Sequence, residues 1–144
     1  MSHLRRLRAT DIMTEHVVTG RPNDSLSRIA TDMERHKIGS VVIVENRRVV
    51  GILTERDFVR IVKQGIMLGR DRAKHHMTKP VVTVQSDASV ADIIKLIRKK
   101  HVRHLPVLGK NRRLVGIIGS RDLVKVGTDD LDLAKFLFNR SGFL

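Results

Sequence analysis

Residues 51–57 read Gly-Ile-Leu-Thr-Glu-Arg-Asp, and the rest of the chain is organised around this stretch. Apolar residues before Thr54 predict a short buried strand, and Phe58 and Ile61 follow at helical spacing. The stretch is therefore predicted to be a strand-to-helix turn with Thr54 as the N-cap. The N–H groups and partial positive charge of such a helix N-terminus suit a phosphate, and the carboxylate of Asp57 could accept both hydroxyls of a ribose.

A simpler interpretation of this turn needs no ligand. The pattern Thr-x-x-Asp is also a capping box, in which Thr54 and Asp57 close the helix end by themselves. The sequence contains a second copy, however, because residues 116–122 read Gly-Ile-Ile-Gly-Ser-Arg-Asp at a distance of 116 − 51 = 65 residues. A repeat of this kind indicates two copies of one structural unit.

The repeat extends well beyond the turn. Residues 11–14 end in Met-Thr and are echoed by residues 75–78, which lie 64 positions later. The apolar helical positions follow the same offset, with Leu26, Ile29, Ala30 and Met33 in the first copy and Val90, Ile93, Ile94 and Ile97 in the second. One additional residue in the turn at 109–113 changes the offset from 64 to 65. The chain is thus predicted to be two copies of a unit of about sixty residues.

Each copy predicts a Met-Thr segment, a short strand, an amphipathic helix, two apolar strands joined by a turn, and a last helix. This order, with its Gly-x-x-x-x-x-Asp turn, resembles the cystathionine-β-synthase-type (CBS) domain over about residues 10–126. The resemblance implies an α/β (α+β) fold of two tandem β-α-β-β-α units packed about a pseudo-twofold axis. The expected divisions are a basic leader at 1–10, a first unit at 11–64, a linker at 65–75, a second unit at 76–127, and a C-terminal apolar helix or tail at 128–144.

The same resemblance implies a ligand, because CBS pairs bind adenosine derivatives such as AMP, ADP, ATP or S-adenosylmethionine in the clefts between their units. Asp57 and Asp122 would each accept hydrogen bonds from a ribose, and Thr54 would bind a phosphate or ribose oxygen. The base would lie between strand edges and the starts of the following strands. These positions are Thr19, Gly20, Ile38, Gly39 and Ser40 in the first copy and Thr83, Val84, Val102, Arg103 and His104 in the second.

The two copies differ at the turn. Gly119 stands at the position of Thr54, and Ser120 follows one place late, so we expect its hydroxyl to be directed elsewhere. We therefore expect one better site, built on Thr54 and Asp57, with Arg103 or His104 supplying positive charge to the phosphate. A solvated basic edge is the alternative interpretation of Arg103 and His104.

Composition limits the remaining possibilities. With 144 residues and 41% hydrophobic content, the chain can bury one compact core or two small ones. The absence of Cys excludes disulfides and thiolate metal sites and fits a reducing cytoplasm. The basic start lacks the apolar run of a signal peptide, and no segment has the length of a transmembrane helix.

The net charge of +13 raises the possibility of a nucleic-acid partner. The excess is shared by both halves of the chain, and only four aromatic residues, all Phe, are present to stack on bases. Nucleic-acid binding, with the CBS pair as scaffold, is therefore the second hypothesis. A dimerisation module with an empty cleft is the third.

The sequence contains no pattern that predicts catalysis or a metal site. It lacks the Gly-x-Ser-x-Gly, Gly-x-x-x-x-Gly-Lys and Gly-x-Gly-x-x-Gly motifs, and its two close histidine pairs have no carboxylate at ligand spacing. We therefore expect an adenine-nucleotide-binding regulatory module without catalysis, a homodimer of two pairs in a flat disc, acting on a separate protein. The apolar segment at 131–138 would cover its own domain or contact a second subunit.

Overall fold

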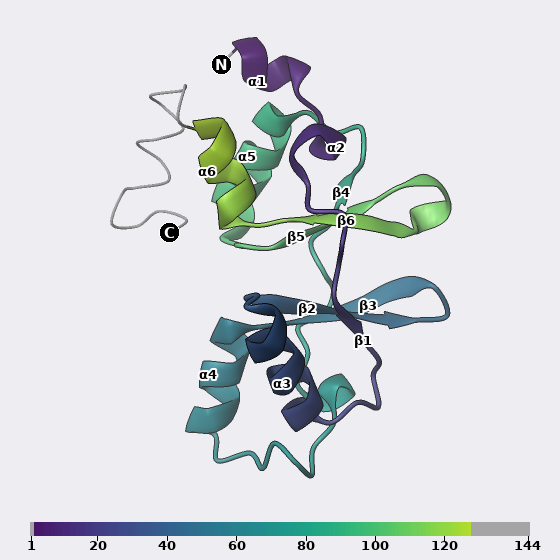
Figure 1. Ribbon diagram of the computed structural model, residues 1–144, viewed down its shortest axis with the longest axis vertical. Helices are drawn as coiled ribbons and strands as arrows, with labels where there is room; N and C mark the ends of the chain where they lie inside the picture. Colours follow the sequence, from purple (N-terminus) through teal and green to yellow (C-terminus); the bar gives the residue numbers. More distant parts are fainter. Residues whose placement is uncertain (1, 128–144) are drawn as a thin grey trace. The chain divides into compact units, whose positions relative to one another are not determined.

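The computed structural model describes residues 2–127, which contain two three-stranded sheets with helices packed on them (Figure 1). The first elements along the chain are α1 (Ser2–Arg6), α2 (Ala9–Ile12), β1 (Thr19–Gly20), α3 (Leu26–His36), β2 (Ser40–Glu45), β3 (Arg48–Thr54) and α4 (Glu55–Lys63). They are followed by the 3₁₀ turn η1 (Ala73–His75), β4 (Val84–Gln85), α5 (Val90–Lys100), β5 (Leu105–Leu108), the 3₁₀ turn η2 (Lys110–Arg112), β6 (Leu114–Ile118) and α6 (Ser120–Gly127). The mixed fold predicted from the sequence is confirmed. The predicted C-terminal apolar segment lies outside the described residues.

The two sheets have the same topology. In each, the short first strand pairs in parallel with the second, and the second pairs antiparallel with the third, in the orders β1-β2-β3 and β4-β5-β6. Even the register shift recurs, between Ile43 and Val44 in β2 and between Val107 and Leu108 in β5. The internal repeat seen in the sequence is therefore a repeat of structure down to single residues.

The turns between the long strands account for the change of offset from 64 to 65. Asn46 and Arg47 join β2 to β3 as a two-residue loop, with positive φ angles of 51° and 64°. Such a turn matches the twist of a hairpin. In the other unit Gly109 and Arg113, the counterparts of Glu45 and Arg48, are joined by a hydrogen bond of 2.8 Å. The three residues of the 3₁₀ turn η2 lie between them, one more than the two between Glu45 and Arg48. The insertion predicted at 109–113 is thus confirmed.

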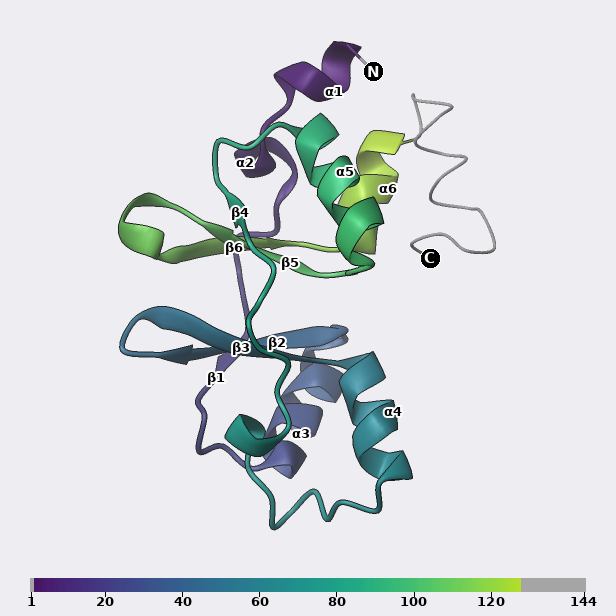
Figure 2. The same ribbon diagram turned by 180° about the vertical axis from the view of Figure 1, so that it is seen from behind.

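Helices cover one face of each sheet. Helices α3 and α4 lie on the same face of β1-β2-β3 in both views, and α5 and α6 lie together on one face of β4-β5-β6 (Figures 1 and 2). The side chains of Leu26, Ile29 and Met33, spaced three and four residues apart on α3, are buried against the first sheet. Helix α5 buries Val90, Ile93, Ile94 and Ile97 in the same way. Ser25 and Ser89 cap these two helices, each accepting a hydrogen bond from the backbone N–H three residues later.

The chain folds into two compact units, and the residues in each unit are not the same as the residues in each sequence repeat. One unit is Val17–Val81, called here the β1–β3 unit. The other combines Met1–His16 with the residues from Val82 onward and is called the β4–β6 unit. The leader was expected to lead into the first sequence unit, but Leu4 and Ala9 are fully buried in the core of the β4–β6 unit. That burial is the physical reason for the difference.

The leader and the linker are equivalent segments of the repeat. Arg8 bridges to Ser89, the N-cap of α5, and 64 residues later Arg72 bridges to Ser25, the N-cap of α3. Ala9 and Ala73, also 64 residues apart, are both completely buried. The beginning of each repeat therefore packs on the sheet formed by the other repeat. Within residues 2–127, no helix combines the length and the apolar character needed to cross a bilayer.

Candidate functional site

Asp57 lies in the first turn of α4 and is only 8% exposed. Its Oδ2 accepts hydrogen bonds from the backbone N–H of Thr54 at 2.9 Å and from the Thr54 hydroxyl at 3.1 Å. The backbone N–H of Asp57 in turn donates to Thr54 Oγ1 at 3.3 Å. The predicted N-cap and capping box are therefore both present, and the interpretation without a ligand describes the contacts between these two residues.

A second group of contacts reaches the other oxygen of Asp57. The hydroxyl of Thr78 donates to Oδ1 at 2.9 Å, and Nη2 of Arg60 lies 3.4 Å from the same atom. That Arg60 nitrogen also donates to the carbonyl of His76 at 2.9 Å. Hydrogen bonds to an ionised group typically contribute about 1.5–3 kcal/mol each, so these contacts fasten the segment 76–78 to the start of α4.

Methionines fix the same segments through packing. Thr78 exchanges two backbone hydrogen bonds with Ile52, and Met77 covers Gly51 so closely that a β-carbon there would overlap the methionine side chain. The same arrangement recurs where Thr14 pairs with Ile117 and Met13 covers Gly116. The Met-Thr repeat seen in the sequence thus has a structural role. Each methionine fills the space above a glycine, and each threonine binds an aspartate.

Asp122 is the counterpart of Asp57 in the β4–β6 unit and is 7% exposed. Its Oδ2 accepts the backbone N–H of Gly119 at 2.8 Å, and its Oδ1 accepts the hydroxyl of Thr14 at 2.9 Å. Of the two hydrogen bonds of a capping box, the one from the N-cap backbone to the aspartate is therefore preserved. The other is absent at this pair because Gly119 carries no hydroxyl. Ser120, the candidate replacement for Thr54, is the first residue of α6.

Other predicted site residues of the β1–β3 unit lie near the start of β2. Ser40 is buried and pairs with Thr54 across β2 and β3, and the carbonyl of Gly39 accepts the backbone N–H of Glu55 at 3.1 Å. These two residues therefore lie beside the turn that holds Asp57. Ile38 instead lines a groove between α3 and α4, which is described below.

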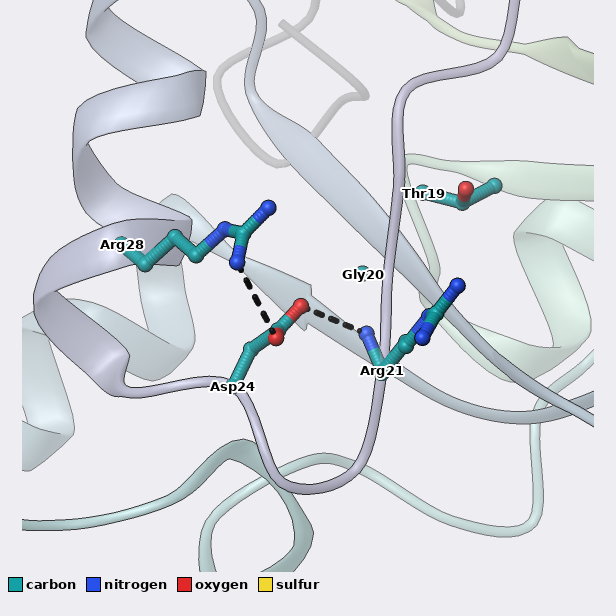
Figure 3. A pocket seen from close by; sticks show the side chains of 5 residues that line it. All are labelled: Thr19, Gly20, Arg21, Asp24 and Arg28. Carbon is teal, nitrogen blue, oxygen red and sulfur yellow. Dashed lines mark hydrogen bonds and ion pairs between the residues drawn. The ribbon is translucent and has the colours of Figure 1, made fainter.

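Thr19 and Gly20 line a different hollow. They pair with Val42 and Ile43, further along β2 from Ser40, and border a polar pocket of about 300 Å³ (Figure 3). Its other lining residues are Arg21, Asp24 and Arg28, none of which was predicted. Asp24 lies between the two arginines, accepting the Arg21 backbone N–H at 2.8 Å and pairing with Arg28 at 3.7 Å. Asp57 is not among the residues lining this pocket.

In the β4–β6 unit, Thr83 directly precedes β4, and residues 102–104 directly precede β5. The side chain of His104 approaches Gly119, where an added β-carbon would lie 3.6 Å from His104 Nδ1 and 3.9 Å from Asp122 Oδ2. His104 thus lies beside Gly119, the residue whose N–H binds Asp122, and Arg103 is exposed. Among residues 2–127, no three His, Asp or Glu side chains are grouped as a metal site would require.

Sequence reasoning missed the residues that complete each carboxylate. Thr78 is 21 residues from Asp57, and Thr14 is 108 residues from Asp122. The available signal was the Met-Thr pair itself, repeated at the same offset as the aspartates. A residue type that recurs with the site is a candidate neighbour of the site.

Comparison with known proteins identifies the family to which the two repeats belong. The family model described as "CBS domain" matches residues 9–64 and again residues 73–129. A protein of Methanopyrus kandleri is 38% identical over 125 residues, which cover 85% of this chain and 64% of that protein. The chain therefore spans less than two thirds of that relative's length.

Solved structures are similar over nearly their whole length. A CBS domain protein of Pyrobaculum aerophilum complexed with AMP has a TM-score of 0.80 and 26% identity, with 90% of this chain and 99% of that one covered. A CBS domain pair in complex with 5′-methylthioadenosine and S-adenosyl-L-methionine has a TM-score of 0.76 and 26% identity, with 83% and 94% covered. With two family matches in tandem, this chain belongs to the CBS domain family.

Proposed function

We propose that this protein is a regulatory module that binds an adenosine-containing ligand, AMP, ADP, ATP or S-adenosylmethionine, without catalysing a reaction. The observation that carries the proposal is the pair of buried carboxylates, Asp57 and Asp122, in the first turns of α4 and α6. Structures of the same family with AMP and with S-adenosyl-L-methionine support the choice of ligand class.

The chemistry of the ligand suits such a carboxylate. The 2′ and 3′ hydroxyls of a ribose lie side by side, so they can donate to the two oxygens of one aspartate, and charge-assisted hydrogen bonds are about twice as strong as neutral ones. The N–H groups at the start of α4 or α6 offer a favourable field for phosphate. A 2′-phosphate would be repelled by the carboxylate, so we expect 2′-phosphorylated nucleotides to be excluded.

The proposed regulation depends on the chain segments that are hydrogen-bonded to the two carboxylates. Each accepts a hydrogen bond from a Met-Thr segment, through Thr78 or Thr14, so a ligand that alters these contacts would alter the fastening of that segment. A ligand shifts a conformational equilibrium only by the difference in its affinity for the two states. We propose that this change is transmitted to a separate protein.

We also propose that the module acts as a homodimer. Helices α3 and α4 border an apolar groove of about 560 Å³, lined by Met33, Ile38, Phe58, Val62 and Leu68 among others. Val59 and Val62 on α4 are 70% and 64% exposed. Glu34, Glu55 and Lys37 also line this groove. A surface that carries both signs of charge can complement a second copy of itself about a twofold axis, so a second copy of this chain fits the face.

The ligand proposal is tested by titrating the full chain with AMP, ADP, ATP and S-adenosylmethionine. Calorimetry measures the heat of binding, and thermal unfolding measures the change in melting temperature. Stabilisation by a ligand follows mass action and amounts to about 2.7 kcal/mol when the ligand is present at 100 times its dissociation constant. We expect saturable binding of at least one of the four and binding weaker by about tenfold or more for its 2′-deoxy form. Absence of binding by all four would refute the proposal.

A second function is favoured by one observation, the net charge of +13. A nucleic-acid-binding role predicts affinity for oligonucleotides that falls steeply with salt, because phosphate contacts release counterions. Tight, salt-dependent oligonucleotide binding that AMP does not displace, together with no response to adenosine ligands, would favour this second function.

A further inference from the structure

We propose that the tips of the two long hairpins, residues 46–48 and 110–113, bind the phosphate backbone of double-stranded DNA. The inference goes beyond the adenosine proposal and gives the second candidate function a defined surface. The observation behind it is the triplet Asn-Arg-Arg, which stands at both tips, as residues 46–48 and as residues 111–113. The two triplets are 65 residues apart, so the internal repeat extends to exposed turns that no core packing constrains.

Both tips are exposed and basic. In both views the loop of each hairpin extends beyond the helices packed on its own sheet (Figures 1 and 2). Residues 109–113 contain three cations and no carboxylate, whereas residues 45–48 contain two cations and Glu45. Four exposed side chains at the tips form no ion pair with any residue of 2–127: Arg47, Lys110, Arg112 and Arg113. We therefore expect the tip of the β4–β6 unit to contribute the larger share of the binding.

The backbone at the tips indicates that the arginines have a function. Arg47 and Arg112 adopt left-handed φ angles of 64° and 58°. At such an angle a β-carbon lies too close to the following carbonyl oxygen, and glycine avoids this strain. Two-residue hairpin turns such as residues 46–47 accordingly favour Asn-Gly, yet at both tips arginine follows the asparagine. A tip that needed only to turn the chain could carry glycine, so the guanidinium group is present although it strains the turn.

Two other basic residues with a left-handed backbone have a different explanation. Lys37 and His101, with φ angles of 53° and 54°, are the C-caps of α3 and α5. A basic side chain at the C-terminal end of a helix is favoured by the helix dipole. No α-helix ends at either hairpin tip, so the dipole does not account for Arg47 and Arg112.

A further arginine lies at the same end of the β4–β6 sheet. Nη1 of Arg8 donates to the carbonyl of Asp87 at 3.4 Å, and its counterpart Arg72 makes the equivalent contact in the other unit. The backbone N–H of Ser86 donates to the carbonyl of Leu108, the last residue of β5, at 2.8 Å. The loop that Arg8 contacts therefore runs beside the base of the hairpin, and cations from the start of the chain add to those of the tip.

The shape and composition of the tips favour one kind of partner. The major groove of DNA admits a two-stranded β-ribbon, and guanidinium groups bind phosphate oxygens in pairs. The major groove of an RNA duplex is too narrow for such a ribbon. Single strands are usually bound by stacking their bases on aromatic rings. Phe58 is the only Phe, Tyr or Trp within residues 2–127, and it lines the groove between α3 and α4. We therefore expect a DNA duplex, bound through its phosphates.

The experiment measures the affinity of the full chain for a short labelled DNA duplex by fluorescence anisotropy, over a range of salt concentrations. Arg47→Gln combined with Arg112→Gln removes one charge from each tip and keeps a side chain at the strained backbone position. Each lost phosphate contact lowers the slope of log affinity against log salt by about 0.9, so we expect a decrease of about 1.8 and binding weaker by about tenfold or more.

Arg35→Gln combined with Lys99→Gln is the matched control, because it removes the same charge from exposed positions. Arg35 and Lys99 lie in the last turns of α3 and α5, which lead into the starts of β2 and β5, at the opposite end of each sheet from the hairpin tip. We expect this control to change the slope and the affinity much less. Equal losses in the two double variants would show that net charge alone binds the duplex, and the inference would be wrong.

A glycine pair tests the argument from backbone strain. Arg47→Gly combined with Arg112→Gly removes the same two charges and relieves both left-handed positions. We expect the urea midpoint of unfolding to stay unchanged or to rise, while duplex binding weakens as it does in the glutamine pair. A lower midpoint would show that the arginines stabilise the fold, and this too would overturn the inference.

The outcomes separate the inference from the two candidate functions. If the wild-type chain does not bind the duplex at low salt, the inference and the second candidate function both fail, while the AMP titration still decides the first. If the duplex binds but the glutamine pair behaves as its control does, only the inference fails. Tighter binding of single-stranded DNA, of an RNA duplex or of vesicles containing phosphatidylserine would assign the tips to another partner and would also overturn the inference.

Discussion

At the scale of single residues, the structure depends on two pairs, Met77 over Gly51 and Thr78 on Asp57. The glycine is required by space, since its backbone is not in the left-handed region and the methionine occupies the volume of a β-carbon. The threonine gives a buried carboxylate one of the donors without which it would be costly to bury. Packing and polar contacts of neighbouring residues thus fasten the same two-residue segment.

Replacing Gly51 with alanine should destabilise the protein by about 1–3 kcal/mol, because the new methyl group must displace Met77. Chemical denaturation measures the change. Gly69→Ala is the matched control and should be nearly neutral, since its β-carbon would meet only Ser27 Oγ at 3.7 Å. In a Met77→Ala background the cost of Gly51→Ala should shrink markedly. An unchanged cost in that background would show that the methionine is not the cause.

At the scale of elements, helix α3 and the linker are held together. Leu26 and Ser27 donate backbone hydrogen bonds to the carbonyls of Asp71 and Leu68, and Ala73 donates to that of Asp24. The Asp71 carboxylate lies 2.7 Å from His76 Nε2 and also accepts the Arg72 backbone N–H. The hydrogen bond with His76, followed by that from Arg72, holds the pKa of Asp71 below its usual value of 3.8.

This pKa has a consequence for acid stability. Because the pKa of Asp71 is lower in the folded than in the unfolded chain, its ionised form favours folding above about pH 4, and this contribution disappears as the pH falls through the folded-state value. Asp71→Asn should therefore lose less stability than wild type between pH 5 and pH 3, as measured by urea unfolding at each pH. Identical losses for the two proteins would contradict the assignment.

Most of the helices and strands, and their order, could be predicted from the sequence. The strand-to-helix turns, the caps at Ser25, Ser89 and Thr54, and the extra residue between β5 and β6 all follow from local patterns, which residues near in sequence decide. The pairing of each Met-Thr segment with the sheet of the other repeat could not be predicted. The spacing of the motifs gives the order of the segments along the chain but not the strand with which each segment pairs. The equivalence of Arg8-Ala9 with Arg72-Ala73 was the available signal.

The candidate site was predicted only in part. Asp57 and Asp122 are indeed buried at helix N-termini, as the turn motif indicates. Their hydrogen-bond donors include Thr78 and Arg60 at Asp57 and Thr14 at Asp122. Two of these three contacts join residues far apart in sequence, and no local pattern determines such contacts. Hence the threonines that bind the two carboxylates had to come from the three-dimensional structure.

At the scale of the whole molecule, two copies of one unit carry related sites that differ in detail. In both units a buried aspartate accepts the hydroxyl of a Met-Thr segment, but Thr54 stands beside one aspartate and Gly119 beside the other. The proposed dimer face on α3 and α4 is a further property of the β1–β3 unit. Binding and assembly can then be altered independently by mutation.

The dimer is tested at this scale. Val59→Glu together with Val62→Glu places charge on the exposed apolar surface of α4 and should reduce the molar mass in solution from dimer to monomer, measured by light scattering after gel filtration. Lys63→Glu, at the next position, is the control and should remain dimeric. A monomeric wild type, or a dimeric double variant, would contradict the proposed face.

The most direct test of the central claim is the amide NMR spectrum during an AMP titration. The Gly119 N–H donates to Asp122 Oδ2 at 2.8 Å, so a ribose on that carboxylate must change its resonance. The Thr54 N–H donates to Asp57 Oδ2 in the same way, at 2.9 Å. We predict a saturable shift of at least one of these two amides. Saturation by AMP with neither amide moving would contradict the account.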